Sequence, residues 1–141
     1  MELIYERAME KTGRVPFQQY AKLNIIWLEG SPDEDITDGH IDGLVRFADA
    51  HTIVTMSEED YYETYDYTPK GDYRKVINAK NAAGEKYNII TLPITAEDVE
   101  WLGWRANYLN YYAGNNVVLV PVYEDVMDAE ALRILGEIYS D

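Results

Sequence analysis

Two side chains that could act together in catalysis, His40 and Asp42, are separated by a single residue. The residues around them predict a strand over positions 40–47, and alternation along a strand would place His40, Asp42 and Arg46 on one face. An imidazole can transfer protons near neutral pH, and a carboxylate can accept two parallel hydrogen bonds from a guanidinium. This face could therefore bind a cationic substrate, although a His-x-Asp pattern on a strand is also compatible with a purely structural role.

The acidic segment that precedes His40 raises the alternative of a metal site. A calcium-binding loop requires a glycine at its sixth position and a glutamate at its twelfth, but counting from Asp33 these positions hold Asp38 and Leu44. A zinc site would need another histidine or a cysteine, and the second histidine, His51, has no matching carboxylate spacing. We therefore expect neither a metal ion nor another cofactor.

The charge of the chain restricts its partners. Its 141 residues include 12 Lys plus Arg against 26 Asp plus Glu, which gives a formal net charge of −14. Such a chain repels phosphate backbones and anionic lipid surfaces but attracts a small amine or guanidine. With 47% hydrophobic residues and no apolar run long enough to span a membrane, the composition predicts a globular protein. The charged start of the sequence favours a cytoplasmic location.

The sequence contains no cysteine. This polypeptide therefore cannot form a disulfide or a thiolate zinc site, and it cannot supply a cysteine nucleophile. It also has no phosphate-binding loop, no Rossmann glycine pattern and no nucleophile elbow. These features exclude most classes of enzyme.

The elements that would position these residues alternate between strand pairs and helices. The predicted helices cover residues 2–11, 17–22, 72–82 and 128–139, and the predicted strands cover residues 23–28, 40–47, 51–56, 87–92, 107–112 and 117–122. Ser57 is expected to cap an acidic helical turn, and Thr95 begins a weaker capping motif. The pattern predicts one α/β domain over residues 1–141, built from ββαβ-like units. The 13 Tyr and 3 Trp are expected to be packing residues.

Three segments together resemble the agmatine deiminases and the related bacterial peptidylarginine deiminases. The first joins Ile-Ile-Trp-Leu-Glu-Gly at residues 25–30 to Thr-Asp-Gly-His-Ile-Asp at residues 37–42, and the second is Val-Arg-Phe-Ala-Asp at residues 45–49. In the third, Ala-Asn-Tyr-Leu-Asn-Tyr-Tyr at residues 106–112 leads into Val-Val-Leu-Val-Pro at residues 117–121. Order, spacing and residue identity agree with this family from Lys22 onward.

The resemblance implies about two ββαβ blades of a pentein-type, five-bladed α/β propeller. It further implies the family's chemistry, in which a cysteine thiolate attacks the guanidinium carbon, ammonia leaves and water hydrolyses the covalent adduct. By the motif match, His40 would be the catalytic residue that transfers protons, and Asp42 would bind the guanidinium of the substrate. The same resemblance suggests a role in polyamine (putrescine) biosynthesis.

The sequence also departs from the family, whose cysteine lies in a glycine-rich C-terminal motif that is not found here. We therefore expect an agmatine deiminase-like fragment or subunit that is inactive alone and that needs a complementing polypeptide. The alternative is a non-catalytic module that binds a cationic amine, a guanidine or a protein partner. Under either hypothesis, open sheet edges favour a homo-oligomer.

Overall fold

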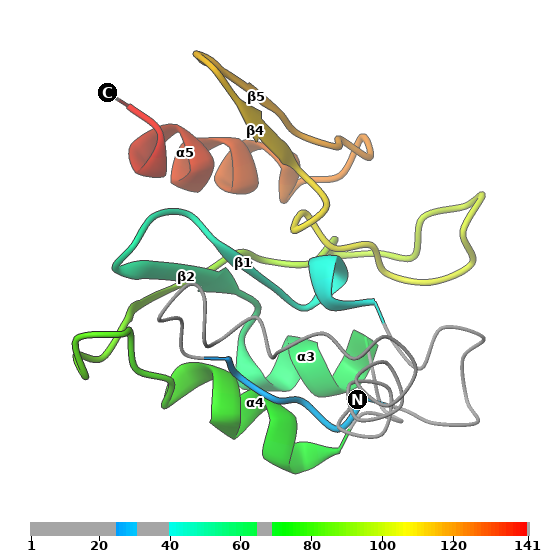
Figure 1. Cartoon of the computed structure of the whole chain (residues 1–141). Helices are drawn as coiled ribbons and strands as arrows, with labels where there is room; N and C mark the ends of the chain where they lie inside the picture. Colours follow the sequence, from blue (N-terminus) through cyan, green and yellow to red (C-terminus); the bar gives the residue numbers. More distant parts are fainter. Residues whose placement is uncertain (1–24, 31–39, 65–68, 141) are drawn as a thin grey trace, which may run out of the picture.

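The computed structural model describes residues 25–30, 40–64 and 69–140 of the chain. Helices and strands follow one another along these residues, as Figure 1 shows. In chain order they are the 3-10 helix η1 (Ile41–Gly43), strands β1 (Val45–Phe47) and β2 (Thr52–Thr55), helices α3 (Glu58–Thr64) and α4 (Lys70–Ile77), strands β3 (Asn88–Thr91), β4 (Tyr112–Gly114) and β5 (Val117–Leu119), and helix α5 (Asp128–Ile138). The helices predicted at residues 2–11 and 17–22, and the acidic segment before His40, lie outside the described residues.

The central sheet has the strand order β1-β2-β3. β1 and β2 form an antiparallel hairpin in which Val45 lies opposite Thr55, and β3 runs parallel to β2 with Ile89 opposite Ile53. A parallel pair needs a long crossover connection, and here α3 and α4 supply it. The described chain is therefore α/β, and residues 45–91 have the expected ββαβ order with two helices in the crossover.

The side chains of β2 alternate between two buried layers. Ile53 packs with Leu28 and Val76 in one cluster, whereas its neighbour Val54 belongs to a larger cluster that includes Leu135 of α5. All four residues of β2 are buried, as expected for a β-branched strand covered on both faces. Figure 1 shows α4 on one side of the sheet and α5 on the other.

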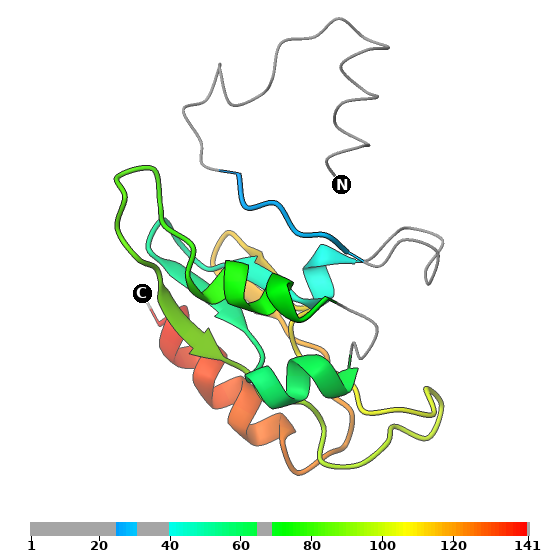
Figure 2. The same ribbon diagram turned by 90° about the horizontal axis from the view of Figure 1, so that it is seen from below.

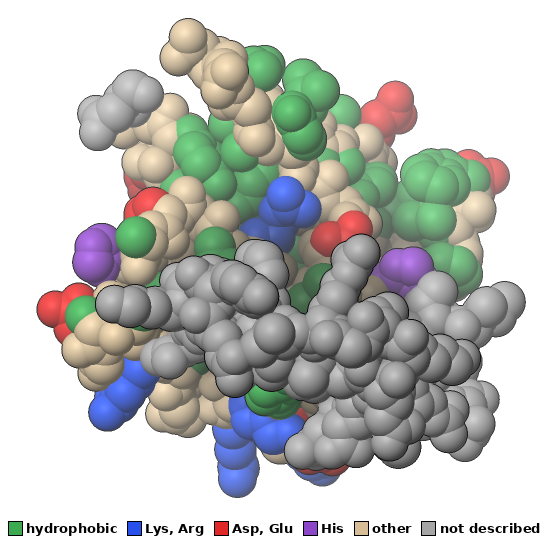
Figure 3. Space-filling model, in the orientation of Figure 1, with side chains coloured by type: hydrophobic (Ala, Val, Ile, Leu, Met, Phe, Trp, Pro, Cys, Tyr) green, Lys and Arg blue, Asp and Glu red, His purple; other side chains and the backbone are tan. Residues whose placement is uncertain are grey.

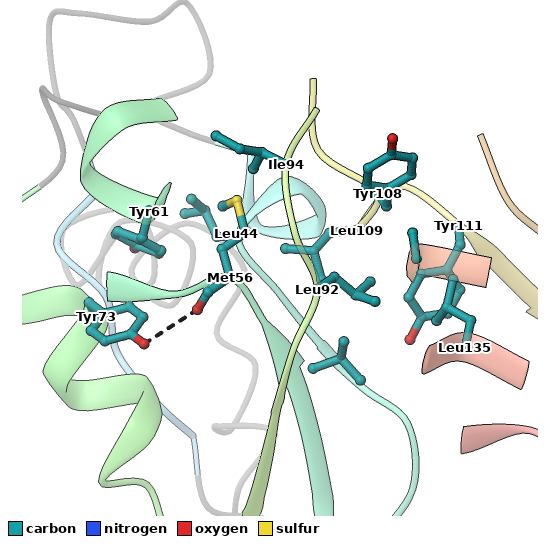
Figure 4. Close-up of a cluster of buried hydrophobic side chains, with 12 residues drawn as sticks. Leu44, Met56, Tyr61, Tyr73, Leu92, Ile94, Tyr108, Leu109, Tyr111 and Leu135 are labelled. Carbon is teal, nitrogen blue, oxygen red and sulfur yellow. Dashed lines mark hydrogen bonds between the residues drawn. The ribbon is translucent and has the colours of Figure 1, made fainter. Parts of the chain in front are cut away.

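Tyrosines form much of the larger core cluster. Tyr61, Tyr108 and Tyr111 are at most 2% exposed, and the hydroxyl of Tyr73 donates a 3.3 Å hydrogen bond to the carbonyl oxygen of Met56 (Figure 4). A tyrosine ring buries a large apolar area while its hydroxyl still finds a polar partner. The expected packing role is confirmed for these four tyrosines.

The strand predicted over residues 40–47 is correct only in its second half. The amide of Leu44 donates a 3.0 Å hydrogen bond to the carbonyl oxygen of Ile41, which closes the 3-10 turn η1 ahead of β1. Asp42 and Gly43 have low strand propensity, and the turn allows Leu44, 7% exposed, to enter the core. Local chemistry and burial therefore favour a turn over an extended chain.

The strand predicted over residues 107–112 is also shorter than expected. The side-chain oxygen of Asn107 accepts a 3.0 Å hydrogen bond from the amide of Leu109, which stabilises a local turn. The strand begins only at Tyr112. The predicted strand over residues 23–28 is likewise not found where it is described, since residues 25–28 have no regular structure.

Helix α4 ends earlier than the helix predicted over residues 72–82, at Ile77. The side-chain oxygen of Asn81 accepts a 3.0 Å hydrogen bond from the amide of Glu85, which stabilises a turn instead of further helix. Gly84 lies in this turn with a φ of 83°, a conformation that glycine adopts without strain.

The last described elements are a hairpin and a helix. A hairpin and a helix were predicted here, but β5 ends at Leu119, before the end of the strand predicted over residues 117–122. β4 and β5 pair in antiparallel fashion around a turn in which Asn116 has a φ of 60°, a value that asparagine tolerates better than most residues. Tyr112 and Leu119 of this hairpin are each 61% exposed. α5 has 11 residues, and no described helix is long and apolar enough to cross a membrane.

Candidate functional site

The turn at η1 carries both predicted site residues. His40 precedes η1 in an extended conformation, with φ −105° and ψ 106°, and Asp42 is the middle residue of the turn. Both side chains are exposed. Because the chain turns here, strand alternation does not place His40 and Asp42 on one face with Arg46, and that prediction is wrong. The two residues remain neighbours on one short turn at the protein surface.

Arg46 has a packing role in the described structure. Its guanidinium carbon lies 4.8 Å from the centre of the Tyr111 ring, a cation–π geometry, and the side chain is half-buried. A guanidinium held over a buried ring in this way joins β1 to the segment before β4. Arg46 is therefore occupied by a contact inside the fold.

The turn that carries Asp42 is anchored to the sheet by the two residues that follow Asp42. Gly43 is buried, and Leu44 packs in the core cluster with Val54. The hydroxyl of Thr55 donates a 2.8 Å hydrogen bond to the carbonyl oxygen of Leu44, in a buried position. Side chains on a turn anchored in this way keep their position, which is what a binding site requires.

A second anchor holds the segment upstream of His40. The carboxylate of Asp72, 1% exposed, accepts hydrogen bonds of 2.8 and 2.9 Å from the amide of Glu29 and one of 3.0 Å from the amide of Gly30. Lys75 lies 3.1 Å from Asp72 and 2.9 Å from the Glu29 carboxylate, and hydrogen bonds to Glu29 and then Asp72 raise the pKa of Lys75. Helix α4 thus binds the chain at residues 29–30 through a buried charge.

Among the described residues, no group of three His, Asp or Glu side chains is placed to hold a metal ion. The acidic residues before His40 that raised the alternative of a metal site, at positions 33–38, lie outside the described part of the chain.

The loop at residues 95–106 carries two exposed tryptophans that were not predicted from the sequence. Trp101 and Trp104 are 74% and 62% exposed, so the prediction that they are packing residues is wrong for this chain. They border a cleft of about 840 Å³ that Arg105 and Asn110 also line. The sequence carried no clear signal of this exposure, because two tryptophans three positions apart could also share one buried face of a helix.

The same loop is held in place by polar contacts, and no helix follows Thr95. Thr95 is fully buried, and its hydroxyl donates to the carbonyl oxygen of Glu97 at 2.8 Å and accepts from the amide of Ala106 at 2.9 Å. Arg105 donates to the Thr95 carbonyl oxygen at 2.5 Å and forms a 2.8 Å ion pair with Glu63. The threonine closes a loop across its base instead of capping a helix.

Residues 16–141 match the family model of the Porphyromonas-type peptidyl-arginine deiminases. A provisionally named agmatine deiminase of Latilactobacillus sakei is 29% identical over 136 residues, which cover 83% of this chain and 37% of the relative. The chain therefore spans little more than a third of the length of that curated relative.

Two solved structures are similar in both sequence and fold. A provisionally named arginine deiminase from Porphyromonas gingivalis has 32% identity and a TM-score of 0.60, over 80% of this chain and 34% of that one. A cysteine-to-serine variant of an agmatine deiminase from C. jejuni, with substrate bound, has 28% identity and a TM-score of 0.57, over 96% of this chain and 37% of that one. Each similarity includes most of the present chain.

Proposed function

Because this chain belongs to the Porphyromonas-type peptidyl-arginine deiminase family, we propose that it forms the guanidine-binding part of an agmatine deiminase-like hydrolase. The observation that carries this proposal is the anchored turn η1, which presents the Asp42 carboxylate and has the His40 imidazole directly before it. The family match includes both residues. An exposed imidazole and an exposed carboxylate two residues apart could transfer protons and bind a guanidinium, respectively.

Asp42 is proposed to bind the substrate. A carboxylate pairs with a planar guanidinium through two parallel hydrogen bonds, which fixes the orientation of the carbon to be attacked. The net charge of −14 would attract such a cation over a longer range. Agmatine, a guanidine with a second cationic group, suits both features.

His40 is proposed to transfer protons. Attack of a thiolate on the guanidinium carbon forms a carbon–sulfur bond. Collapse of this adduct then breaks one carbon–nitrogen bond, and the leaving nitrogen must gain a proton to depart as ammonia. An imidazole can deliver that proton and then remove one from the water that hydrolyses the adduct. The 141 residues include no cysteine, so the thiolate would come from outside these residues, and they would be inactive alone.

We include in the proposal the pentein arrangement expected from the family. Residues 45–91 would be one blade of an α/β propeller, and β4, β5 and α5 would belong to another. The exposed residues Tyr112 and Leu119 support association, since a two-stranded hairpin with an apolar surface gains stability when another surface covers it. That surface would belong to a second copy of this chain or to the complementing polypeptide. We further propose that the assembly is cytoplasmic and contributes to putrescine formation.

The test measures ammonia release from agmatine by the chain mixed with a second polypeptide that carries the family's glycine-rich His-Cys segment. We expect release from the mixture but not from either part. His40→Ala should abolish it, and Asp42→Asn should weaken agmatine binding by about tenfold or more, since a neutral amide cannot pair with a guanidinium in the same way. Glu59→Gln, which also removes an exposed carboxylate, is the matched control and should change neither quantity. Ammonia release that survives His40→Ala would contradict the proposed role of His40.

The second candidate function is binding without catalysis, which the exposed Asp42 carboxylate could provide by itself. In that case agmatine should raise the melting temperature of the isolated chain, Asp42→Asn should cancel the effect, and no added cysteine segment should produce ammonia. Calorimetric titration with agmatine separates this function from a purely structural role, for which no heat of binding is expected.

A further inference from the structure

We propose that the loop at residues 95–106 is a docking surface for a basic, partly apolar segment of another polypeptide. This inference is independent of the guanidine chemistry at His40, because it rests on a different part of the chain. The loop leaves the body of the molecule between β3 and β4, as Figures 1 and 2 show from two directions.

The first observation is an exposed apolar surface shared by two clefts. The cleft of about 840 Å³ contains Trp101 and Trp104, and a neighbouring cleft of about 640 Å³ contains Trp101 again together with Val122 and Val126. These four side chains are 58–80% exposed. Figure 3 shows hydrophobic side chains grouped beside acidic ones at this edge of the molecule. Exposed apolar side chains grouped in this way are characteristic of interaction sites.

The second observation is that the loop is already ordered for binding. The carboxylate of Asp125 accepts hydrogen bonds from the amides of Ala96, at 3.0 and 3.1 Å, and Glu97, at 3.3 Å. The amide of Val99 donates a 3.0 Å hydrogen bond to the carbonyl oxygen of Trp104, and Gly103 turns the chain between the two tryptophans with a φ of 79°. A surface fixed in this way loses little conformational entropy when a partner binds.

Charge identifies the occupant. The smaller cleft is lined by five acidic residues and by no lysine or arginine: Glu97, Asp98, Glu100, Glu124 and Asp125. Asp125 is used by the loop itself, whereas the other four are exposed and make no ion pair within the described part of the chain. Arginine and lysine side chains would pair with these carboxylates, and arginine also stacks on indole rings. A second copy of this chain, with its own charge of −14, is a poor match for the same surface.

The occupant must also be partly apolar, because charge alone would leave the indoles uncovered. Tryptophan and arginine are enriched at the centres of protein interfaces, where buried aromatic anchors account for most of the affinity. A segment in which basic and aliphatic residues alternate would place its cations on the carboxylates and its aliphatic side chains on Trp101 and Trp104.

The test uses a short synthetic peptide of alternating arginine and leucine, titrated into the intact chain at physiological ionic strength. Binding is followed by tryptophan fluorescence and by calorimetry. We expect Trp101→Ala and Trp104→Ala each to weaken the affinity by about tenfold, as for buried aromatic anchors elsewhere. Tyr112→Ala, which removes an exposed aromatic ring outside the loop, should leave the affinity unchanged.

Two further peptides separate docking from simple charge attraction. Replacing the leucines by serine should weaken binding, and replacing the arginines by glutamate should abolish it. Glu100→Gln and Glu124→Gln should each weaken binding more than Glu59→Gln, a change of equal charge on α3. All of these positions are exposed, so folding should be retained, which the melting temperature checks.

Three outcomes would overturn the proposal. One is unchanged affinity in both tryptophan variants, and another is equal binding of the serine-containing peptide, since either would mean attraction by net charge alone. The third is a concentration-dependent dimer, seen by sedimentation without peptide and lost in Trp101→Ala. That result would make a second copy the occupant of this surface.

Discussion

The hydroxyl of Tyr108 donates a 2.7 Å hydrogen bond to Oδ1 of Asp128, the first residue of α5. Tyr108 is fully buried. The same carboxylate accepts hydrogen bonds from the amide of Tyr123, at 3.1 and 3.2 Å, and from the amide of Asp125, at 3.2 Å. One side chain at the start of α5 therefore fastens both the segment before β4 and the loop that leads into the helix.

Tyr108→Phe should lower the free energy of unfolding by about 1.5–3 kcal/mol, because it removes a hydrogen bond to a charged group and leaves the carboxylate with one donor fewer. Urea denaturation measures this change. Tyr112→Phe is the matched control, since Tyr112 is largely exposed, and it should alter the stability by less than about 0.5 kcal/mol. An equal loss in both variants would mean that the Asp128 contact adds nothing.

Stability should also fall in alkali. Burial, followed by the hydrogen bond to Asp128, raises the pKa of Tyr108, and burial, followed by the hydrogen bond to Tyr139, raises that of Tyr111. A group whose pKa is higher in the folded state keeps its proton there more firmly than in the unfolded chain. The stability that each of these tyrosines contributes to the fold is therefore complete below about pH 10 and is lost as the pH rises above that value. Urea midpoints at about pH 8 and about pH 11 should show the loss, and Tyr108→Phe should reduce it.

Asp72→Asn should destabilise the fold by about 3 kcal/mol, because the amide offers a single acceptor where the buried carboxylate now takes two backbone amides and a lysine. Asp98→Asn is the control, an exposed aspartate whose replacement should have little effect. Hydrogen exchange at Glu29 and Gly30 should accelerate in the Asp72 variant, whereas unchanged exchange there would place the loss elsewhere.

The loop at residues 95–106 should lose an anchor in acid. Hydrogen bonds from the backbone amides of Ala96, Met127 and Glu97 lower the pKa of Asp125. A carboxylate with a lowered folded pKa contributes stability that is present above its ordinary value of 3.8 and is lost as the pH falls through the lower folded value. Asp125→Asn should therefore be less stable than the parent near neutral pH, with a difference that narrows toward about pH 3. A constant difference would exclude titration of Asp125 as the cause.

The elements that the sequence predicted correctly are those specified by short-range rules. The β-branched run of β2 and the apolar period of α5 each agree with a single secondary structure, and tertiary contacts reinforce both. Ser57 caps α3 as expected, because its hydroxyl accepts the amide of Asp60 at 3.1 Å and donates to the Asp60 carboxylate at 2.7 Å. The family resemblance was also carried by the sequence alone.

The errors lie where side chains compete with regular structure. The turn at η1 and the turn begun by Asn107 both replace predicted strands. Each turn places a leucine, Leu44 or Leu109, in the buried core. Alternation could not anticipate either, because it counts polar and apolar residues without the hydrogen bonds that close a turn. The loop that exposes Trp101 and Trp104 is closed by hydrogen bonds of Thr95 with Arg105 and Ala106, which a pattern of polar and apolar residues does not record.

The parallel pairing of β2 with β3 also determines the order in which the chain can fold. The β1–β2 hairpin closes a short loop, but β3 can join β2 only after the long segment holding α3 and α4 has been brought together, at a larger cost in loop-closure entropy. Until that happens, one edge of β2 has unpaired backbone groups and its apolar residues lie uncovered. Refolding should therefore be slower than hairpin formation and, at high protein concentration, should compete with aggregation through this strand.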